Sequence, residues 1–245
     1  METKKLDNNQ LEHFNTDLMQ DSYWEVFLKE LVDKIDISKP FKLLDIGGGN
    51  GRFADKLIEL YPNIEVTILD NSDYLLAQNT PNPRKHLICG SVIDIDNFVC
   101  SMNYDIITIN WVLHHLIGNT RKDSLKIMSS TLSSLTKYLS PNGRISIIEN
   151  LYCGLIWDSF PSRLIYFVTS IHNSIISSLV KRIGFNTAGV GVCFLSEKII
   201  KGMVIEIGLK FISTTVIDQW NYNILSRLIL HTHPMIMRNL WITKG

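Results

Sequence analysis

The sequence predicts a doubly wound α/β domain, in which a mostly parallel sheet of seven strands carries helices on both faces. Three observations support this fold class. Short apolar runs recur along the chain, most segments between them are long enough for a helix, and a glycine-rich stretch directly follows the first run. Buried strands that alternate with helices are typical of right-handed βαβ units. With 245 residues, the chain is long enough to bury one large core.

A helix is the first predicted element, because residues 18–36 place their apolar side chains on roughly one helical face. It precedes the sheet, so we expect residues 1–40 to form a helical cap on the main domain, which spans residues 41–245. Five short apolar runs then predict the first five strands. These runs are residues 42–46, 65–69, 86–90, 104–110 and 144–149.

The helix between the fourth and fifth predicted strands has the clearest pattern. Its leucines and methionine between residues 125 and 139 recur at spacings of three and four. The sequence Ser-Pro-Asn-Gly at residues 140–143 predicts the turn that ends this helix. Two final strands, at residues 209–216 and 239–243, would complete the sheet.

Residues 151–201 depart from the alternation and predict a helical insertion after the fifth strand. The segment is rich in aromatic side chains, namely Tyr152, Trp157, Phe160, Tyr166 and Phe167. These side chains would give the insertion an apolar surface above the sheet edge, as a lid over a substrate or as a contact in a homodimer. The alternative is that they only pack the insertion onto the core.

Composition and charge narrow the class of partner. Lysine and arginine together number 24, as do the acids, so no global basic field favours binding to nucleic acid. The four cysteines form no C-x-x-C pair, which indicates free thiols in a reducing compartment and no metal site. Neither a secretory signal nor an apolar stretch of about 18 residues is present. These features predict a cytoplasmic protein without stable membrane insertion.

Four glycines within residues 47–51 form the most informative motif. They follow a predicted strand and precede a predicted helix, where a glycine loop lets a nucleotide-like ligand approach backbone N–H groups. Asp70 follows nineteen residues after Gly51, at the end of the second strand, where it can accept hydrogen bonds from both ribose hydroxyls. The pattern Gly49-x-Gly51-x-x-Ala54 also fits a nicotinamide dinucleotide fingerprint, so the glycines alone leave two cofactors open.

The surrounding residues resemble the class I S-adenosylmethionine-dependent methyltransferases, which have a Rossmann-like fold. The first motif of that family is a strand ending in an acid followed by G-x-G-x-G, as in residues 45–51. The resemblance continues through residues 66–70, 104–110 and 139–144, and it covers roughly residues 40 to 150. It implies S-adenosylmethionine as the cofactor.

The resemblance also implies individual contacts. Gly47, Gly49 and Gly51 would line the methionine and ribose portion of the cofactor, Asp70 would hold the ribose, and Asp45 would organise the loop or the cofactor ammonium. Further implied cofactor contacts are Asn71, Ser91, Val92 and Asn110. Ser91 lies in the segment where many relatives hold the adenine amine with an aspartate, and its hydroxyl can still form a hydrogen bond.

Two histidines follow the fourth predicted strand, at the carboxyl edge where ligands of such folds gather. Trp111 and His114 resemble the W-x-x-H stretch of plant-type small-molecule O-methyltransferases, in which the histidine is the base. Glu149 matches the carboxylate that orients this base in that group. His115 is the alternative base, and a purely structural role for both histidines stays open.

These observations together predict methyl transfer to a small apolar or aromatic molecule, most often to oxygen, with no nucleic acid partner. Two other functions stay open. The chain could bind S-adenosylmethionine for regulation or for another reaction without methyl transfer. It could also be a nicotinamide-dependent oxidoreductase, a reading that rests on the glycine pattern alone.

Overall fold

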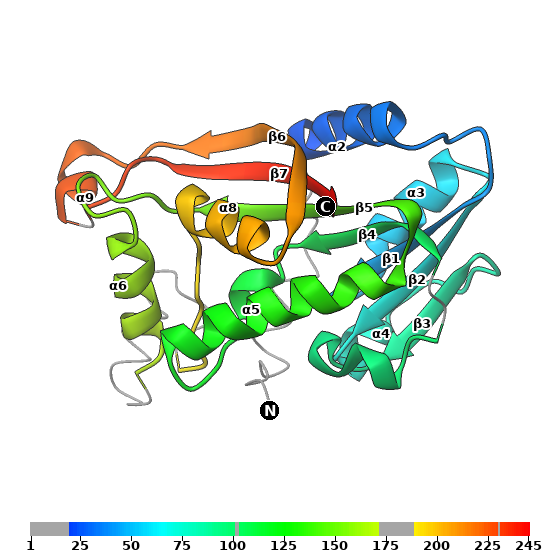
Figure 1. Ribbon diagram of the computed structural model, residues 1–245, viewed down its shortest axis with the longest axis horizontal. Coiled ribbons are helices and arrows are strands. Elements are labelled where there is room, and N and C mark those ends of the chain that lie inside the picture. Colours follow the sequence, from blue (N-terminus) through cyan, green and yellow to red (C-terminus); the bar gives the residue numbers. More distant parts are fainter. Residues whose placement is uncertain (1–19, 101–102, 172–188, 230) are drawn as a thin grey trace.

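The computed structural model describes residues 20–100, 103–171, 189–229 and 231–245, and its centre is a seven-stranded sheet (Figure 1). The strands lie in the order β3-β2-β1-β4-β5-β7-β6. Their bounds are β1 Phe41–Ile46, β2 Ile64–Asp70, β3 Lys85–Cys89, β4 Tyr104–Asn110, β5 Leu139–Leu151, β6 Leu209–Trp220 and β7 Met235–Lys244. Strands β1 to β5 are parallel, and β7 pairs antiparallel with both β5 and β6. The predicted fold class is therefore confirmed.

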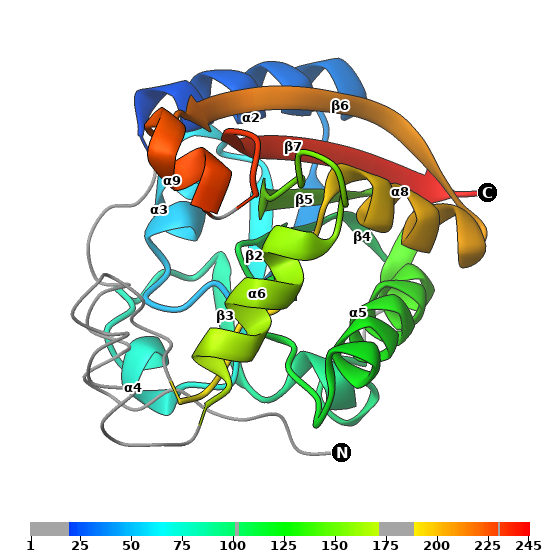
Figure 2. The same cartoon turned by 90° about the vertical axis from the view of Figure 1, so that its left-hand side faces the viewer.

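Helices cover both faces of the sheet (Figures 1 and 2). One face carries α2 and α3, and the opposite face carries α5 and α8. At one end of the molecule lie α6 and α9. The bounds are α2 Asp21–Lys34, α3 Arg52–Leu60, α4 Asp73–Leu76, α5 Arg121–Leu135, α6 Phe160–Thr169, α8 Glu197–Glu206 and α9 Ile224–Ile229. Short 3-10 turns are η2 Val92–Asn97, η3 Leu113–His115 and η4 Thr136–Tyr138.

The two faces of the sheet hold separate hydrophobic clusters. Leu43 packs beneath α2 and α3, whereas its neighbour Leu44 packs on the side of α5 and α8. Successive side chains of a strand point to opposite faces, so a strand covered on both sides reads as one continuous apolar run. This is why the central strands could be found from short runs rather than from alternation.

Strand β5 begins earlier than the sequence predicts. Helix α5 ends at Leu135, and the expected turn at residues 140–143 lies inside β5 as an irregularity in its pairing with β4. Tyr104 pairs with Leu139, and two residues later Ile106 pairs with Arg144. A side chain on Gly143 would lie 2.7 Å from the Tyr104 carbonyl oxygen, so this close approach of two backbones requires glycine.

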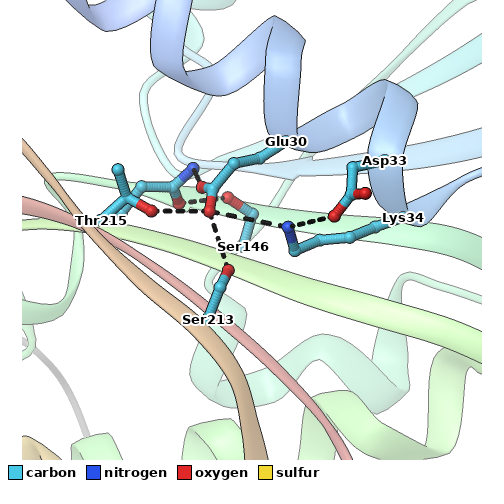
Figure 3. A network of polar contacts seen from close by, with 7 residues as sticks. Glu30, Asp33, Lys34, Ser146, Ser213 and Thr215 are labelled. Atoms are coloured by element: carbon cyan, nitrogen blue, oxygen red, sulfur yellow. Dashed lines mark hydrogen bonds and ion pairs between the residues drawn. The ribbon is translucent and has the colours of Figure 1, made fainter.

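Helix α2 is fixed to the sheet by a buried carboxylate, which Figure 3 shows among its hydrogen-bond donors. Glu30 Oε1 accepts hydrogen bonds from Ser213 at 2.8 Å and Thr215 at 2.7 Å, both on β6. Its Oε2 accepts one from Asn239 Nδ2 on β7 at 2.8 Å, and Asn239 accepts one from Ser146 on β5. One carboxylate thus binds the helix directly to β6 and β7, and through Asn239 to β5.

Helix α2 lies within the predicted cap, and residues 1–19 are outside the described part of the chain. The predicted insertion at residues 151–201 contains α6 and the start of α8, and residues 172–188 of it are likewise outside. Whether this segment is a lid or a subunit contact stays a prediction. Across the described residues, no helix combines the length and apolar character that crossing a membrane requires.

Candidate cofactor and catalytic site

The loop between β1 and α3 has a backbone that only glycine adopts easily. Gly47, Gly49 and Gly51 have φ values of 71°, 49° and 78°, in the left-handed region. A side chain on Gly47 would also collide with Val112, and one on Gly51 with Asn79. Gly51 is the N-cap of α3 and has no side chain, while Asn50 Oδ1 accepts a hydrogen bond from Arg52 N at 3.4 Å. The loop therefore brings the N-terminus of α3 to the carboxyl end of β1, a position that favours a polar or anionic ligand.

Asp70 closes the loop from the neighbouring strand. At the end of β2, its Oδ2 accepts a hydrogen bond from Gly49 N at 2.9 Å, and its Oδ1 accepts one from Ser72 N at 2.8 Å. Burial raises the pKa of this carboxyl, while the backbone hydrogen bonds act to lower it. Each carboxylate oxygen keeps further acceptor capacity. Asp70 is thus oriented by the same loop that the glycines form.

Asp45 is a buried acid with one oxygen left without a partner. It lies in β1 and is 1% exposed. Its Oδ1 accepts a hydrogen bond from Thr108 Oγ1 at 2.8 Å, whereas its Oδ2 has no hydrogen-bond partner among the described residues. Burial raises the pKa of Asp45 to about 7, and the charge of Asp70 adds to this effect. The free oxygen is therefore an acceptor that awaits a donor.

Asn110 shows the same deficit at the end of β4, which pairs with β1. Its Oδ1 and Nδ2 are both buried, and neither has a partner in the part of the chain that the structure describes. Buried polar atoms are almost always hydrogen-bonded in folded proteins. Unpaired atoms at the carboxyl ends of two adjacent strands fit a polar ligand that supplies both donors and acceptors.

The structure places the remaining predicted cofactor contacts around this centre without bringing them to one point. Asn71 is exposed and follows Asp70 directly. Ser91 is the N-cap of η2, and its Oγ accepts a hydrogen bond from Ile93 N at 3.3 Å. Its hydroxyl therefore already has a structural role. Val92 is buried at 8% exposure and packs in the core beneath α5.

His114 and Glu149, which sequence reasoning paired, lie in contact. His114 is in η3 after β4, and Glu149 is near the end of the adjacent parallel strand β5. His114 Nδ1 lies 2.7 Å from Glu149 Oε2, and both side chains are buried. When Nδ1–H donates to this carboxylate, Nε2 is left as the unprotonated nitrogen.

His115 has a different environment. Its ring centroid lies 4.2 Å from that of His114. Burial lowers the pKa of His115 well below its usual range, and the neighbouring His114 acts in the same direction. Glu149 Oε2 contacts His114, where the carboxylate can stabilise the protonated form of that imidazole.

Phe194 is a neighbour of this pair that sequence reasoning missed. Its ring stacks on His114 with centroids 4.5 Å apart and contacts Tyr152 at 4.8 Å. The backbone N–H of Cys193 donates to the His114 carbonyl at 2.9 Å, which holds this segment against the histidine. Phe194 is eighty residues from His114 in the chain, so no local pattern could reveal the contact. Of the predicted aromatic residues, Tyr152 lies beside Phe194, whereas Trp157 and Phe167 are exposed.

Tyr23 was also missed, although its helix was predicted. Its ring stacks on Trp111 with centroids 5.5 Å apart. Trp111 has a φ of 54°, unusual for a residue with a side chain, and its N–H donates to the Ile148 carbonyl at 2.8 Å. The segment after β4 is thus held by both β5 and α2.

Comparison with known proteins supports the fold and finds similarity to methyltransferases. The model of a family described as "Methyltransferase domain" matches residues 44–145. The O-methyltransferase 12 of Dictyostelium discoideum is 30% identical over 151 residues, which is 56% of this chain and 37% of that protein. The ribosomal RNA small subunit methyltransferase C of Buchnera aphidicola is 28% identical over 134 residues, covering 53% of this chain and 40% of that protein. The chain therefore spans less than half the length of these relatives.

Solved structures share the fold across nearly the whole chain. An S-adenosylmethionine-dependent methyltransferase from Mesorhizobium loti superposes with a TM-score of 0.59 at 15% identity, covering 92% of this chain and 100% of that one. The [4+2]-cyclase SpnF gives a TM-score of 0.61 at 11% identity, covering 90% of this chain and 81% of that one. At such identities the likeness concerns the fold alone, and one fold hosts different reactions.

Proposed function

We propose that this protein methylates a small apolar or aromatic molecule on oxygen. The premise is that residues 44–145 form a domain of the class I S-adenosylmethionine-dependent methyltransferase superfamily. His114 is the general base of this reaction, and Glu149 orients it. The observation that carries the proposal is the buried pair of these two side chains, with His114 Nδ1 2.7 Å from Glu149 Oε2.

The residues of the site fit S-adenosylmethionine. The left-handed glycines leave room for its methionine and ribose portions, and Asp70 has acceptor capacity for the ribose hydroxyls. The unpaired oxygen of Asp45 and the unpaired amide of Asn110 fit the polar groups of the cofactor. When bound, the cofactor supplies a methyl group on a positively charged sulfur, which an oxygen nucleophile can attack.

His114 can activate such a nucleophile. Its Nε2 would accept the proton of a hydroxyl while the oxygen of that group bonds to the methyl carbon and the methyl–sulfur bond breaks, its electron pair staying on the sulfur. The imidazolium that results is stabilised by the Glu149 carboxylate at its other nitrogen. Because this pair is buried, the charge of Glu149 acts in a low dielectric and is little screened by water.

The rings beside His114 favour an apolar or aromatic acceptor. Phe194 and Tyr152 form an aromatic wall directly next to the base. Burial raises the pKa of Tyr152 far above its ordinary value, which keeps this side chain neutral. A flat apolar molecule can stack on such a wall, whereas a strand of nucleic acid would also need phosphate-binding cations, and the chain has no excess of these.

The test is methyl transfer from labelled S-adenosylmethionine to a panel of phenols and alcohols, whose hydroxyl groups are protonated at neutral pH. We expect His114→Ala to lower kcat by about 10²-fold or more, since a positioned general base contributes on that scale. Glu149→Gln should give a smaller loss, because a neutral amide can accept the Nδ1–H but carries no charge. The matched control is His86→Ala, which removes an exposed histidine of β3 and should leave turnover unchanged.

Two outcomes would contradict the proposal. A His114→Ala variant with near wild-type turnover would remove His114 as the base. Tight cofactor binding without transfer to any acceptor of the panel would favour the open alternative, a protein that uses the cofactor without methyl transfer.

A further inference from the structure

We propose that Tyr23 of helix α2 binds the α-carboxylate of the cofactor through its hydroxyl, while Asp45 binds the α-ammonium, so that α2 is a wall of the cofactor site. This inference rests on the proposed cofactor binding and extends it to an element outside residues 44–145. The ligand chemistry is an amino acid zwitterion, the free end of the methionine portion.

The Tyr23 hydroxyl is buried without a partner. The residue is 1% exposed, and in the described ranges no group lies within hydrogen-bond distance of its oxygen. Burial raises the pKa of Tyr23 well above its ordinary value, and the nearby Asp45 raises it further. The phenol therefore stays protonated and is a hydrogen-bond donor. A buried hydroxyl without a protein partner is completed by a ligand or by an ordered water.

The neighbours of the ring place Tyr23 beside the expected ligand. Its ring stacks on Trp111, directly after β4, and meets Phe53 edge-on at 6.3 Å. Phe53 is the second residue of α3 and follows the glycine loop. The ring is thus held between the two segments that leave the carboxyl ends of β1 and β4.

The unpaired groups around Tyr23 have complementary chemistry. The phenol offers one O–H donor, and the unpaired Oδ2 of Asp45 offers an anionic acceptor. An α-amino acid presents the opposite set, a carboxylate that accepts and an ammonium that donates. Charge-assisted hydrogen bonds of this kind are the stronger ones. The free end of the methionine portion would therefore satisfy both atoms at once.

Helix α2 holds Tyr23 rigidly. Tyr23, Phe27 and Glu30 are buried on the face of α2 that packs against the sheet. Glu30 anchors the helix through the bonds to Ser213, Thr215 and Asn239 (Figure 3). The phenol is consequently fixed before the ligand arrives, which reduces the ordering that binding requires.

The experiment compares three ligands by isothermal titration calorimetry with the full chain. S-adenosylhomocysteine carries both the carboxylate and the ammonium, its decarboxylated analogue keeps only the ammonium, and 5′-deoxy-5′-methylthioadenosine has neither. We expect Tyr23→Phe to raise the Kd of S-adenosylhomocysteine by about tenfold. The Kd values of the other two ligands should not change, because they lack the carboxylate.

Two further variants complete the comparison, one to test the ammonium contact and one as a control. Asp45→Asn should weaken S-adenosylhomocysteine and the decarboxylated analogue but not 5′-deoxy-5′-methylthioadenosine. Tyr61→Phe is the matched control, since it removes a phenol oxygen from the far end of α3, beside Phe41 at the start of β1. It should leave all three Kd values unchanged.

Stability separates ligand binding from a purely structural role of the phenol. Removing an unpaired buried hydroxyl should raise the melting temperature of the ligand-free protein, whereas loss of a structural hydrogen bond would lower it. A Tyr23→Phe variant that binds S-adenosylhomocysteine as tightly as the wild type would overturn the inference and leave the cofactor proposal standing. A wild type that binds none of the three ligands would overturn both.

Discussion

At the scale of single residues, two of the buried carboxyl groups of the site, those of Glu149 and Asp45, have opposite surroundings. Glu149 has a counter-charge available, because His114 contacts it and can become protonated. Among the described residues, Asp45 accepts one hydrogen bond, from the Thr108 hydroxyl, and lies near the repulsive charge of Asp70. Environment rather than residue type sets the behaviour of a carboxyl. Glu149 is thus suited to stabilise a positive charge in catalysis, and Asp45 to receive one from a ligand.

Because the carboxyl of Asp45 is buried, we expect the free energy of unfolding to fall as the pH rises. Its pKa is about 7 in the folded protein against 3.8 in a model peptide, so the folded state resists ionisation. The cost of ionising Asp45 in the folded protein is absent below about pH 4, grows as the pH rises and is complete above about pH 7. At about 1.36 kcal/mol per pKa unit, its full size is at most about 4 kcal/mol.

We therefore expect Asp45→Asn to stabilise the ligand-free protein by about 1–3 kcal/mol at pH 8 and by less at pH 4.5. Urea unfolding at the two pH values measures this difference. Asp94→Asn, which changes an exposed acid, is the control and should have no effect at either pH. Equal unfolding midpoints for Asp45→Asn and wild type at pH 8 would show that Asp45 carries no buried charge.

Many residues of the candidate site could be predicted from the sequence. The residues that could not be predicted were missed for a physical reason. Asp45, the glycines and Asp70 are signalled by local motifs, because strand, loop and helix follow one another in the chain. The pair of His114 and Glu149 was available through the family resemblance. Tyr23 and Phe194 carry no such signal, since each reaches the site through packing between segments far apart in sequence.

At the scale of elements, α2 and β5 show where periodicity succeeds and where it stops. The predicted helix at residues 18–36 contains α2, because its apolar positions repeat at helical spacing. Periodicity does not report that Glu30 is buried, since acids are usually solvated. The early start of β5 depends on the contact of Gly143 with Tyr104 of the neighbouring strand, which no pattern within residues 139–144 contains.

Helix α2 should depend strongly on its single buried carboxylate. Glu30→Ala would leave the donors of Ser213, Thr215 and Asn239 without their acceptor. We expect a loss of about 3 kcal/mol in the free energy of unfolding, measured by chemical denaturation. Glu30→Gln should lose less, because its amide oxygen still accepts hydrogen bonds. Glu25→Ala, on the exposed face of the same helix, is the control, and an equal effect of both alanine variants would refute the anchor.

At the scale of the whole molecule, the fold indicates where the site lies more closely than it indicates which reaction takes place there. The [4+2]-cyclase and the methyltransferases among the structural neighbours share this architecture. Open parallel sheets bind ligands at the carboxyl ends of their strands, and Asp45 and Asn110, which have unpaired polar atoms, lie near the ends of β1 and β4. The reaction has to be argued from His114 and its neighbours, because the sheet serves many chemistries.

The choice of cofactor can be tested on the intact protein through ligand-dependent stability. A ligand that binds only the folded state at about 100 times its Kd adds about 2.7 kcal/mol. For a chain of this size that corresponds to a rise of about 5–10 °C in the melting temperature. We expect S-adenosylhomocysteine to produce this rise and NADH to produce none, since the Asp45 oxygen and the Tyr23 hydroxyl match an amino acid zwitterion that NADH lacks. A rise with NADH and none with S-adenosylhomocysteine would contradict this prediction. It would favour the alternative that the glycine loop binds a nicotinamide dinucleotide, which the spacing of the glycines also permits.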